Sequence, residues 1–348
     1  MKAIRLYGPH DLRLETIPDP PDPGPGEVVV RITAAGICGS DLHTYLDGRI
    51  GDTLVQHPVV PCHECAGVIE RAGPDARAGD GAALVPGVRV AVDPAIPCAG
   101  CEWCKRGDPN LCIDLRFFGL PPENGCLQER VRVPALCCFP IPESIDDAGG
   151  ALLEPLGVAL HAADLAHLRM GRNVAVLGAG PIGLLIVHTA RIAGGGPVYV
   201  SEPLPWRRDL AEEAGGVLLD PDDPAGDLLR RTNGRGVDAV FEAAWGGSAI
   251  EQAAAMACPG GTLVLVGIPG DDRCSLRHSV ARRKGLTLRF CRRMKFTYPR
   301  AIRLLAEGHI NPGILVSHTF PLAQAAEAFT MNAAYAPGVV KTIIRVTP

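Results

Sequence analysis

Short apolar runs separated by turn residues dominate the first third of the chain. The runs 28–32 (VVVRI) and 88–92 (VRVAV) are rich in β-branched residues and are flanked by glycine or proline. Runs of this kind are typical of strands. Glycine and proline are dense in 18–26 and 73–87, which indicates loops between short strands. We therefore predict an irregular β-rich domain in this part of the chain.

From about residue 172 the pattern changes to buried strands that alternate with helices. Strands are predicted at 173–177, 198–200, 238–241 and 262–266, and helices at 181–193, 205–214 and 250–257. Such alternation is typical of a parallel α/β sheet, because each crossover helix packs back onto the sheet. The tail from about residue 299 has one clear helix, 301–307, and a final strand, 341–345, which we expect to return to the first domain.

The length of 348 residues also predicts two domains, because single hydrophobic cores stop growing at about 250–300 residues. One domain should be built from 1–155 and 294–348, and the other from 156–293. The sequence shows no internal repeat, low-complexity block or long flexible linker. We expect an α/β protein whose two domains pack directly against each other.

Composition and charge exclude several classes of partner. The chain has 47% hydrophobic and 21% charged residues, as a compact protein does, and its formal net charge is −4. It contains no basic run with interleaved aromatic residues, so we expect no nucleic-acid partner. The N-terminus lacks the apolar stretch of a signal peptide, and no apolar run reaches the ~18 residues of a membrane span. We expect a cytoplasmic protein with a small-molecule ligand and no membrane partner.

Thirteen cysteines are many for such a chain, and their spacing indicates a metal site. Four of them lie in 98–112 with the spacing C-x2-C-x2-C-x7-C. Zinc takes four thiolates in closed structural sites, and these short spacings let one loop wrap the ion. Four free cysteines, or a redox pair, are the competing interpretations. The predicted ligands of a structural zinc are Cys98, Cys101, Cys104 and Cys112.

A second, dispersed group of potential metal ligands precedes the α/β half. Cys38 follows a predicted strand, His63 and Glu64 are adjacent in a later turn, and Glu154 lies just before the α/β half. One thiolate, one imidazole and carboxylates form the mixed ligand set of a catalytic zinc, which keeps one position open for water or substrate. Taken singly, each of these residues is more often ordinary structure.

A glycine-rich turn opens the α/β half. The sequence GAGPIG (178–183) follows a predicted strand and begins a helix, so its glycines and the helix N-terminus suit the pyrophosphate of a dinucleotide. Glu202 ends the second strand, where a carboxylate binds ribose hydroxyls and repels a 2′-phosphate. NAD is therefore favoured over NADP, although Arg207 or Arg208 offers an alternative phosphate ligand. A glycine-rich turn without a ligand is the competing interpretation.

At these residues the chain resembles the zinc-containing medium-chain dehydrogenases, and within them the sorbitol (polyol) dehydrogenase group. The similarity covers nearly the whole sequence and rests on motifs in a fixed order. These are GICGSDLH (36–43), GRIG (48–51), the cysteines of 98–112, EPL (154–156), GAGPIG (178–183) and TYP (297–299). The resemblance implies a GroES-like catalytic domain built from both ends of the chain, a Rossmann domain between them, two zinc ions per chain, and a homotetramer or homodimer.

The resemblance also implies roles for individual residues. Cys38, His63 and Glu64 match catalytic zinc ligands, with Glu154 as a further ligand or as the partner of the metal's water. Substrate contacts are expected from Thr44, Glu154 and Arg293. Coenzyme contacts are expected at Gly178, Gly180, Pro181, Ile182, Gly183, Glu202, Arg207, Val266, Gly267, Ile268, Cys291, Arg292 and Arg293.

Three positions depart from the family pattern. Cys62 replaces the glycine before the His-Glu pair, and Thr44 and Met294 stand where animal sorbitol dehydrogenases have tyrosines near the substrate. The small Thr44 and the apolar, flexible Met294 predict a roomier and less polar pocket. We therefore expect D-sorbitol to be a poorer substrate than another vicinal diol.

Together these residues predict the oxidation of a secondary alcohol, in which zinc lowers the pKa of the substrate hydroxyl and NAD accepts the hydride. Ser40 and His43, shortly after Cys38, are expected to relay the proton toward solvent. A polyol dehydrogenase that yields a ketose is the favoured interpretation. An L-threonine or amino-alcohol dehydrogenase is the second interpretation. A zinc- and NAD-binding redox sensor that uses Cys62 or Cys65 is the third.

Overall fold

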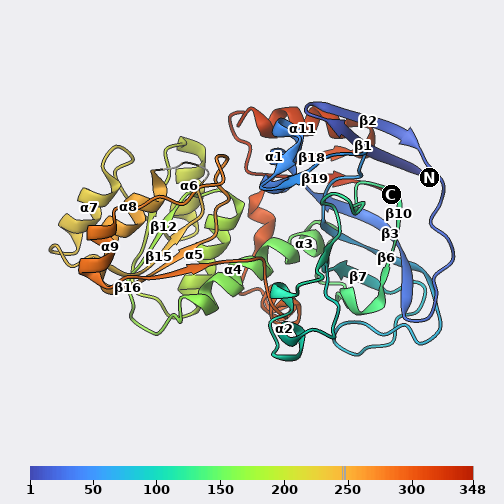
Figure 1. The fold of residues 1–348 in the computed structure, drawn as a ribbon, viewed down its shortest axis with the longest axis horizontal. Coiled ribbons are helices and arrows are strands. Elements are labelled where there is room, and N and C mark those ends of the chain that lie inside the picture. The colour runs from blue at the N-terminus through green and yellow to red at the C-terminus, as the bar shows by residue number, and fades with distance from the viewer. Residues whose placement is uncertain (245, 247, 348) are drawn as a thin grey trace. The chain divides into compact units, whose positions relative to one another are not determined.

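The computed structural model describes residues 1–244, 246 and 248–347, so that Pro348, the end of the predicted catalytic domain, lies outside the described residues. Contacts divide the chain into two compact units (Figure 1). The first unit is Met1–Glu154 with Tyr298–Pro348, and the second is Pro155–Thr297. The first unit is rich in strands and the second alternates strands with helices, so the predicted α/β class is confirmed.

A seven-stranded sheet organises the first unit, in the order β11-β7-β6-β3-β19-β18, and β10 also pairs with β3. Its strands are β3 (Glu27–Gly36), β6 (Glu64–Ala72), β7 (Arg89–Val92), β10 (Arg130–Pro134), β11 (Cys138–Pro140), β18 (Val316–Pro321) and β19 (Lys341–Arg345). β3 carries the apolar run predicted at 28–32, and its valines are fully buried. A strand with strands on both sides has its backbone groups paired by neighbours, which suits such a run.

The remaining elements of the first unit are short. The strands are β1 (Lys2–Gly8), β2 (Asp11–Thr16), β4 (Arg49–Ile50), β5 (Thr53–Leu54), β8 (Ala95–Ile96) and β9 (Arg116–Phe117). The α-helices are α1 (Gly39–Asp47), α2 (Glu102–Lys105), α3 (Asp147–Ala151), α10 (Tyr298–Ala306) and α11 (Ala325–Ala333), and the 3-10 turns are η1 (Pro109–Leu111), η2 (Ala135–Cys137), η3 (Pro312–Leu315) and η4 (Leu322–Gln324).

The C-terminal tail is part of the central sheet. β19, at the red end of the colour range in Figure 1, pairs with β3 in antiparallel register, with Ile343 opposite Gly36. The helix predicted at 301–307 is α10, but the tail has a second helix, α11, where the sequence indicated only one. The buried face of α11 consists of Ala325, Ala328, Phe329 and Asn332. Alanine and asparagine give little hydrophobic contrast, which explains why periodicity did not reveal this helix.

A six-stranded parallel sheet organises the second unit, in the order β14-β13-β12-β15-β16-β17. Its strands are β12 (Val174–Leu177), β13 (Val198–Ser201), β14 (Val217–Leu218), β15 (Val237–Glu242), β16 (Ala257–Leu265) and β17 (Thr287–Phe290). Numbered along the chain, this order is 3-2-1-4-5-6, the arrangement of dinucleotide-binding sheets. A ligand of such a sheet lies beyond the carboxyl ends of the strands, where the order reverses between β12 and β15.

The helices of this part of the chain are α4 (Leu153–Leu165), α5 (Pro181–Ile192), α6 (Pro205–Glu213), α7 (Pro224–Arg231), α8 (Ala249–Met256) and α9 (His278–Lys284). The predicted strands at 173–177, 198–200, 238–241 and 262–266 and the helices α5, α6 and α8 are confirmed. β14 and β17 were not predicted, because β14 has only two residues and β17 is a partly exposed edge strand. Among the described residues, no helix combines the length and the apolarity that a bilayer crossing requires.

Candidate functional site

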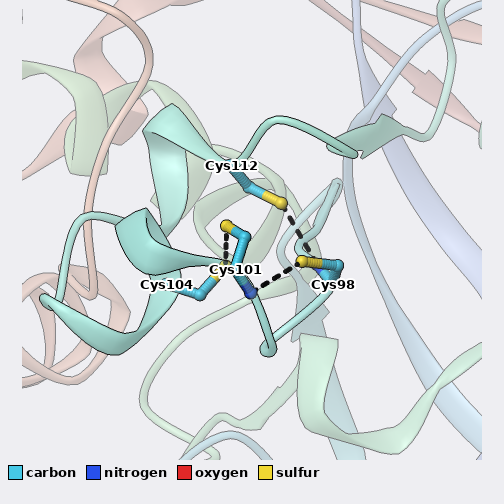
Figure 2. Close-up of side chains that lie close together, drawn as sticks. All are labelled: Cys98, Cys101, Cys104 and Cys112. Carbon is cyan, nitrogen blue, oxygen red and sulfur yellow. Dashed lines mark hydrogen bonds between the residues drawn. The ribbon is translucent and has the colours of Figure 1, made fainter.

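Four cysteine side chains converge in a short lobe of the first unit (Figure 2). The Sγ atoms of Cys98, Cys101, Cys104 and Cys112 all lie within 4.8 Å of one another. A tetrahedral zinc with 2.3 Å bonds to sulfur places its ligands about 3.8 Å apart, so the four thiols fit this ion. α2 and η1 lie within the loop 98–112 and turn the chain back on itself, as the short spacings predicted. Zinc held there would close the loop.

The backbone of the lobe already favours thiolates. The N–H of Cys101 donates to Sγ of Cys98, and the N–H of Cys98 donates to Sγ of Cys112, both at 3.3 Å. Backbone donors, that of Cys104 first, lower the pKa of the Cys101 thiol to about 6, whereas burial and the hydrogen bond with Cys101 raise the pKa of the Cys104 thiol to about 12. A thiolate is the form that binds metal, so this backbone is prepared for the ion.

A second group of metal-binding side chains consists of Cys38, His63 and Glu64, whose ligand atoms also lie within 4.8 Å of one another. β3 and β6 pair in antiparallel register with Gly36 opposite Glu64, which brings the end of β3 to the start of β6. His63 and Glu64 are buried, whereas Cys38 is partly exposed. Three different ligands beside a partly open surface suit a zinc ion with one free coordination position.

Glu154 is buried in the first turn of α4. Neither of the two metal-ligand groups found among the described residues contains it. The geometry therefore supports a three-residue group, and the role of Glu154 remains the prediction made from the sequence.

Asp41 was quoted in the sequence motif without a role, and the structure places it at the centre of the second group. Its carboxylate accepts the N–H of Cys38 at 2.9 Å and the N–H of Cys62 at 3.0 Å. Its Oδ1 also lies 3.6 Å from Nδ1 of His63. Burial alone would lower the pKa of His63, but Asp41 and Cys38 together outweigh burial and raise it. A carboxylate on one ring nitrogen orients the other nitrogen toward a metal.

Lys341 is a second residue that sequence reasoning missed. Its side chain is 2% exposed, its Nζ donates to the carbonyl of Ile37 at 2.9 Å, and it forms an ion pair with the carboxylate of Glu64. Burial would lower the pKa of Lys341, but Glu64, Cys38 and Asp41 together reverse the direction and raise it. Nothing in the local sequence KTIIR indicated a buried charge, because lysine at a strand start is normally exposed.

The turn before His63 is tightly enclosed. Cys62 has a φ of 67°, in the left-handed region that favours glycine, and it stands at the position where the resembling family has glycine. A Cβ at Gly125 would lie 2.7 Å from the carbonyl oxygen of Pro61. The ring of Phe117 in β9 lies 5.1 Å from the ring of His63. The segment that follows the cysteine lobe therefore holds the turn that carries His63.

α1 carries the two predicted relay residues, Ser40 and His43, and the predicted substrate contact Thr44. Ser40, His43 and Thr44 are all buried on this helix. Nδ1 of His43 lies 4.0 Å from the carboxylate of Asp47, whose side chain is 54% exposed. The hydroxyl of Thr44 donates to the carbonyl of Asp41 at 2.8 Å. His43 is thus linked to a solvent-exposed carboxylate, whereas the Thr44 hydroxyl already has an acceptor within its own helix.

The glycine-rich turn between β12 and α5 has the geometry that its sequence predicted. Gly178 has a φ of 91°, and a Cβ there would lie 2.7 Å from the carbonyl oxygen of Ala243. A Cβ at Gly183 would lie 2.9 Å from the carbonyl carbon of Gly178. Gly180 precedes α5 and Pro181 is its first residue, so the helix N-terminus directly follows the turn. Side chains at these glycines would push the turn away from the helix.

Glu202 fixes this turn from the second strand. Its carboxylate accepts the N–H of Ala179 at 2.7 Å and the N–H of Leu204 at 2.9 Å. Arg208 donates to the carbonyls of Glu202 and Leu219, each at 3.0 Å, so it ties the end of β13 to the next loop. A Cβ on Gly180 would lie 3.6 Å from Nη1 of Arg207. Of the two arginines, Arg207 is the one whose guanidinium reaches the turn.

The other predicted coenzyme contacts lie at the same edge of the sheet. Ile182 is in the first turn of α5, and the residues after β16 and β17 are Val266, Gly267, Ile268, Cys291, Arg292 and Arg293. The carboxyl ends of parallel strands lie at the same edge of the sheet, so these residues and the glycine-rich turn lie along the edge where such sheets bind their ligands. Glu242, which the sequence analysis did not identify, lies there too. It is buried at the end of β15, burial raises its pKa, and a Cβ on Gly267 would lie 2.8 Å from its carboxylate.

Comparison with protein families supports both halves of the chain. Residues 24–143 match the alcohol dehydrogenase GroES-like domain. Residues 181–307 match the zinc-binding dehydrogenase family. The first range includes the second metal-ligand group and the cysteine lobe, and the second range begins inside the glycine-rich turn, at Pro181.

Individual relatives cover nearly the full length. A sorbitol dehydrogenase of Bacillus subtilis is 34% identical over 94% of this chain and 92% of its own. A solved alcohol dehydrogenase from Escherichia coli CFT073, complexed with NADH, is 29% identical with a TM-score of 0.89 and covers 99% of each chain. A solved putative zinc-binding dehydrogenase from Sinorhizobium meliloti 1021, bound to NADP, is 33% identical with a TM-score of 0.87 and also covers 99% of each chain.

The cysteine lobe generates a prediction about metal content. Cys101→Ser removes a thiol of the lobe whose pKa is lowered and should reduce the zinc content of protein purified without chelator from about two ions per chain to about one. The melting temperature should fall as well, because structural zinc contributes folding free energy. Metal analysis and thermal unfolding measure both effects. The matched control is Cys274→Ser, which changes an exposed cysteine outside both groups. Equal zinc content in the two variants would rule out the four-cysteine site.

Proposed function

We propose that this chain, which belongs to the zinc-containing medium-chain alcohol dehydrogenase family and is a zinc-binding oxidoreductase, oxidises a secondary alcohol of the polyol class to a ketose with NAD. The observation that carries the proposal is the group Cys38, His63 and Glu64, in which two buried ligands meet a partly exposed thiol. Zinc bound there supplies a Lewis acid that lowers the pKa of an alcohol hydroxyl. The open side of the group leaves room for that hydroxyl.

The chain's own residues have separate tasks in this proposal. Asp41 orients His63 through Nδ1, so the imidazole presents its other nitrogen to the metal. Ser40 takes the alcohol proton, and His43 passes it toward solvent. The contact between His43 and the exposed Asp47 supports this direction, because a carboxylate at the surface stabilises the imidazolium that holds the proton.

NAD rather than NADP is the proposed coenzyme. The two solved relatives hold different coenzymes, so the choice depends on this chain's own residues. Glu202 places a negative charge at the end of β13, where it would repel a 2′-phosphate. Arg208 is engaged by two carbonyls, which leaves Arg207 as the arginine nearer the glycine-rich turn. Arg207 is suited to the pyrophosphate side of that turn.

A vicinal diol is the proposed substrate, because the curated relative is a sorbitol dehydrogenase and because Arg293, Glu154 and Thr44 are expected to bind hydroxyls beside the reacting carbon. The Thr44 hydroxyl keeps its lone pairs for a substrate, since it donates its own proton to Asp41. Its small size and the apolar Met294 favour a polyol other than D-sorbitol. An L-threonine or amino-alcohol substrate is the second candidate, and the experiment below includes both.

Two further expectations belong to this proposal. We propose a cytoplasmic homotetramer or homodimer, as in the resembling family. The redox-sensor alternative is disfavoured by the burial of its thiols. Cys62 and Cys65 are 0% and 1% exposed, and burial raises the pKa of Cys62 well above its usual range. Reactive cysteines are accessible and have lowered pKa values.

The catalytic group generates the second prediction. His63→Ala should abolish NADH formation from every member of a panel of polyols, L-threonine and simple secondary alcohols, while far-UV circular dichroism keeps its wild-type shape. Purified wild-type protein should produce NADH from at least one polyol faster than from L-threonine. The matched control is His309→Ala, because the side chain of His309 is exposed and pairs with the exposed Glu307, outside both metal-ligand groups. Full activity of His63→Ala would show that the group of Cys38, His63 and Glu64 is not catalytic.

The coenzyme assignment is tested with the wild type and Glu202→Gln. The wild type should have a higher kcat/KM with NAD than with NADP. Glu202→Gln loses the charge and keeps one of the two oxygens that accept backbone N–H groups, so it should raise kcat/KM for NADP relative to NAD by about tenfold. Steady-state kinetics with both coenzymes provide the ratio. If the wild type prefers NADP, Arg207 becomes the phosphate ligand and the role of Glu202 is wrong.

The substrate contact of Arg293 generates a further prediction. Arg293→Ala should raise KM for a polyol by about tenfold or more and change KM little for a simple secondary alcohol, because only the polyol has a neighbouring hydroxyl to lose. Kinetics with the best polyol and 2-butanol at saturating NAD separate the two. Equal losses would show that Arg293 serves the coenzyme or the fold.

A further inference from the structure

One buried lysine touches both segments that carry the second metal-ligand group. Nζ of Lys341 donates to the carbonyl of Ile37, the residue directly before Cys38, and pairs with the carboxylate of Glu64. Lys341 and Glu64 are 2% and 1% exposed, so neither charge is screened by solvent. A buried ion pair is costly to assemble, which makes its position beside metal ligands informative.

A glycine in the sheet leaves room for the ion pair of Lys341 and Glu64. Gly36 lies between the two strands that supply it, opposite Glu64 on one side and opposite Ile343 on the other. A Cβ on Gly36 would collide with Oε2 of Glu64 and lie 3.2 Å from Cε of Lys341. The absence of a side chain at this position leaves the space that the lysine and the carboxylate occupy. Gly36 has an ordinary φ, so the space rather than the backbone conformation explains the glycine here.

The charges of the site explain what the lysine contributes. When a divalent ion is bound, the Cys38 thiolate and the Glu64 carboxylate neutralise it, and the buried Asp41 adds a third negative charge. Because the imidazole of His63 is neutral, the three negative charges of Cys38, Glu64 and Asp41 exceed the two positive charges of the ion by one. The ammonium of Lys341 restores the balance. Without it, the donors would hold the ion more strongly and reduce its power to polarise an alcohol.

We propose that Lys341 is a positioning residue for the catalytic metal: it holds Glu64 and shares its charge, so that the ion is bound less tightly and remains a stronger Lewis acid. This inference rests on the proposed function, because it assigns a task at the same site. It differs from a purely structural role, in which Lys341 would only cap the Ile37 carbonyl and its loss would loosen the metal.

Metal release separates these two roles without relying on turnover. Lys341→Met should release its catalytic zinc to a chromophoric chelator about tenfold more slowly than the wild type. Its cobalt-substituted form should show shifted visible absorption bands, since Glu64 then binds the ion with its full charge. The kcat for the best alcohol should fall, whereas Lys341→Arg should restore all three values toward the wild type.

The matched control is another lysine that donates to carbonyls. Nζ of Lys284 donates to the carbonyls of Ala254, Ala255 and Ala257 in the second unit and contacts neither metal-ligand group. Lys284→Met should therefore leave the release rate and the cobalt spectrum unchanged, even if it lowers the melting temperature. A changed release rate in this control would assign the effect of Lys341→Met to general loosening.

A double variant tests whether Lys341 acts through Glu64. Glu64→Gln with Lys341→Met removes both charges and should release zinc at the same rate as Glu64→Gln alone. Different rates in these two variants would overturn the proposal, and so would a Lys341→Met protein that releases zinc as fast as or faster than the wild type. If Lys341→Met alone does not fold, the comparison of Glu64→Gln with the double variant decides between the two roles. A wild-type protein that binds zinc only in the cysteine lobe would instead refute the proposed function.

Discussion

The antiparallel pairing of β3 with β6 is the constraint on which the metal site depends. It sets Gly36 opposite Glu64, so Cys38, just past one strand, meets His63, just before the other. The register of a strand determines the direction of all its side chains, because a shift of one residue turns every side chain to the opposite face. Both faces of β3 are covered, because the consecutive valines 28–30 are all fully buried, and a shift would bring the partly exposed Glu27 and Arg31 into the positions of buried residues. The hydrophobic pattern of a strand thereby determines the distance between metal ligands that the sequence separates widely.

The return of the tail follows from the same sheet. β19 occupies the other side of β3 and supplies the only charge that balances the Glu64 carboxylate among the ion pairs of the described residues. Tyr298, at the start of α10, donates to the carbonyl of Val92 at 2.8 Å and stacks on Phe139 with ring centroids 4.7 Å apart. This tyrosine belongs to the motif TYP, one of the motifs on which the family resemblance rests. Its contacts in the structure anchor the tail to β7 and β11.

How far the sequence determines the site differs from residue to residue. The cysteine lobe and the glycine-rich turn were predictable because all their residues are close in sequence, so that their spacing determines the local geometry. Cys38, His63 and Glu64 were candidates by residue type, but their assignment to one catalytic zinc came from the resemblance, since only the β3–β6 pairing brings them together. Asp41 and Lys341 were missed because a carboxylate in a helix start and a lysine in a strand have ordinary exposed roles. Their functions depend on burial against partners 22 and 277 residues away, which no local pattern encodes.

The two metal-ligand groups are also linked within the first unit. From the cysteine lobe the chain continues through β9, where Phe117 contacts the His63 ring, to the turn whose Gly119 and Gly125 pack against the Cys62 carbonyl. Cys62 adopts a φ that costs a non-glycine residue about 1 kcal/mol or more, and such a conformation persists only where the surroundings enforce it. The segment after the lobe provides that enforcement: Gly125 donates to Val60 and Cys126 donates to Cys62 across the turn. Zinc in the lobe would therefore do more than close its own loop, because it would fix the start of the segment that holds His63 in place for the other metal.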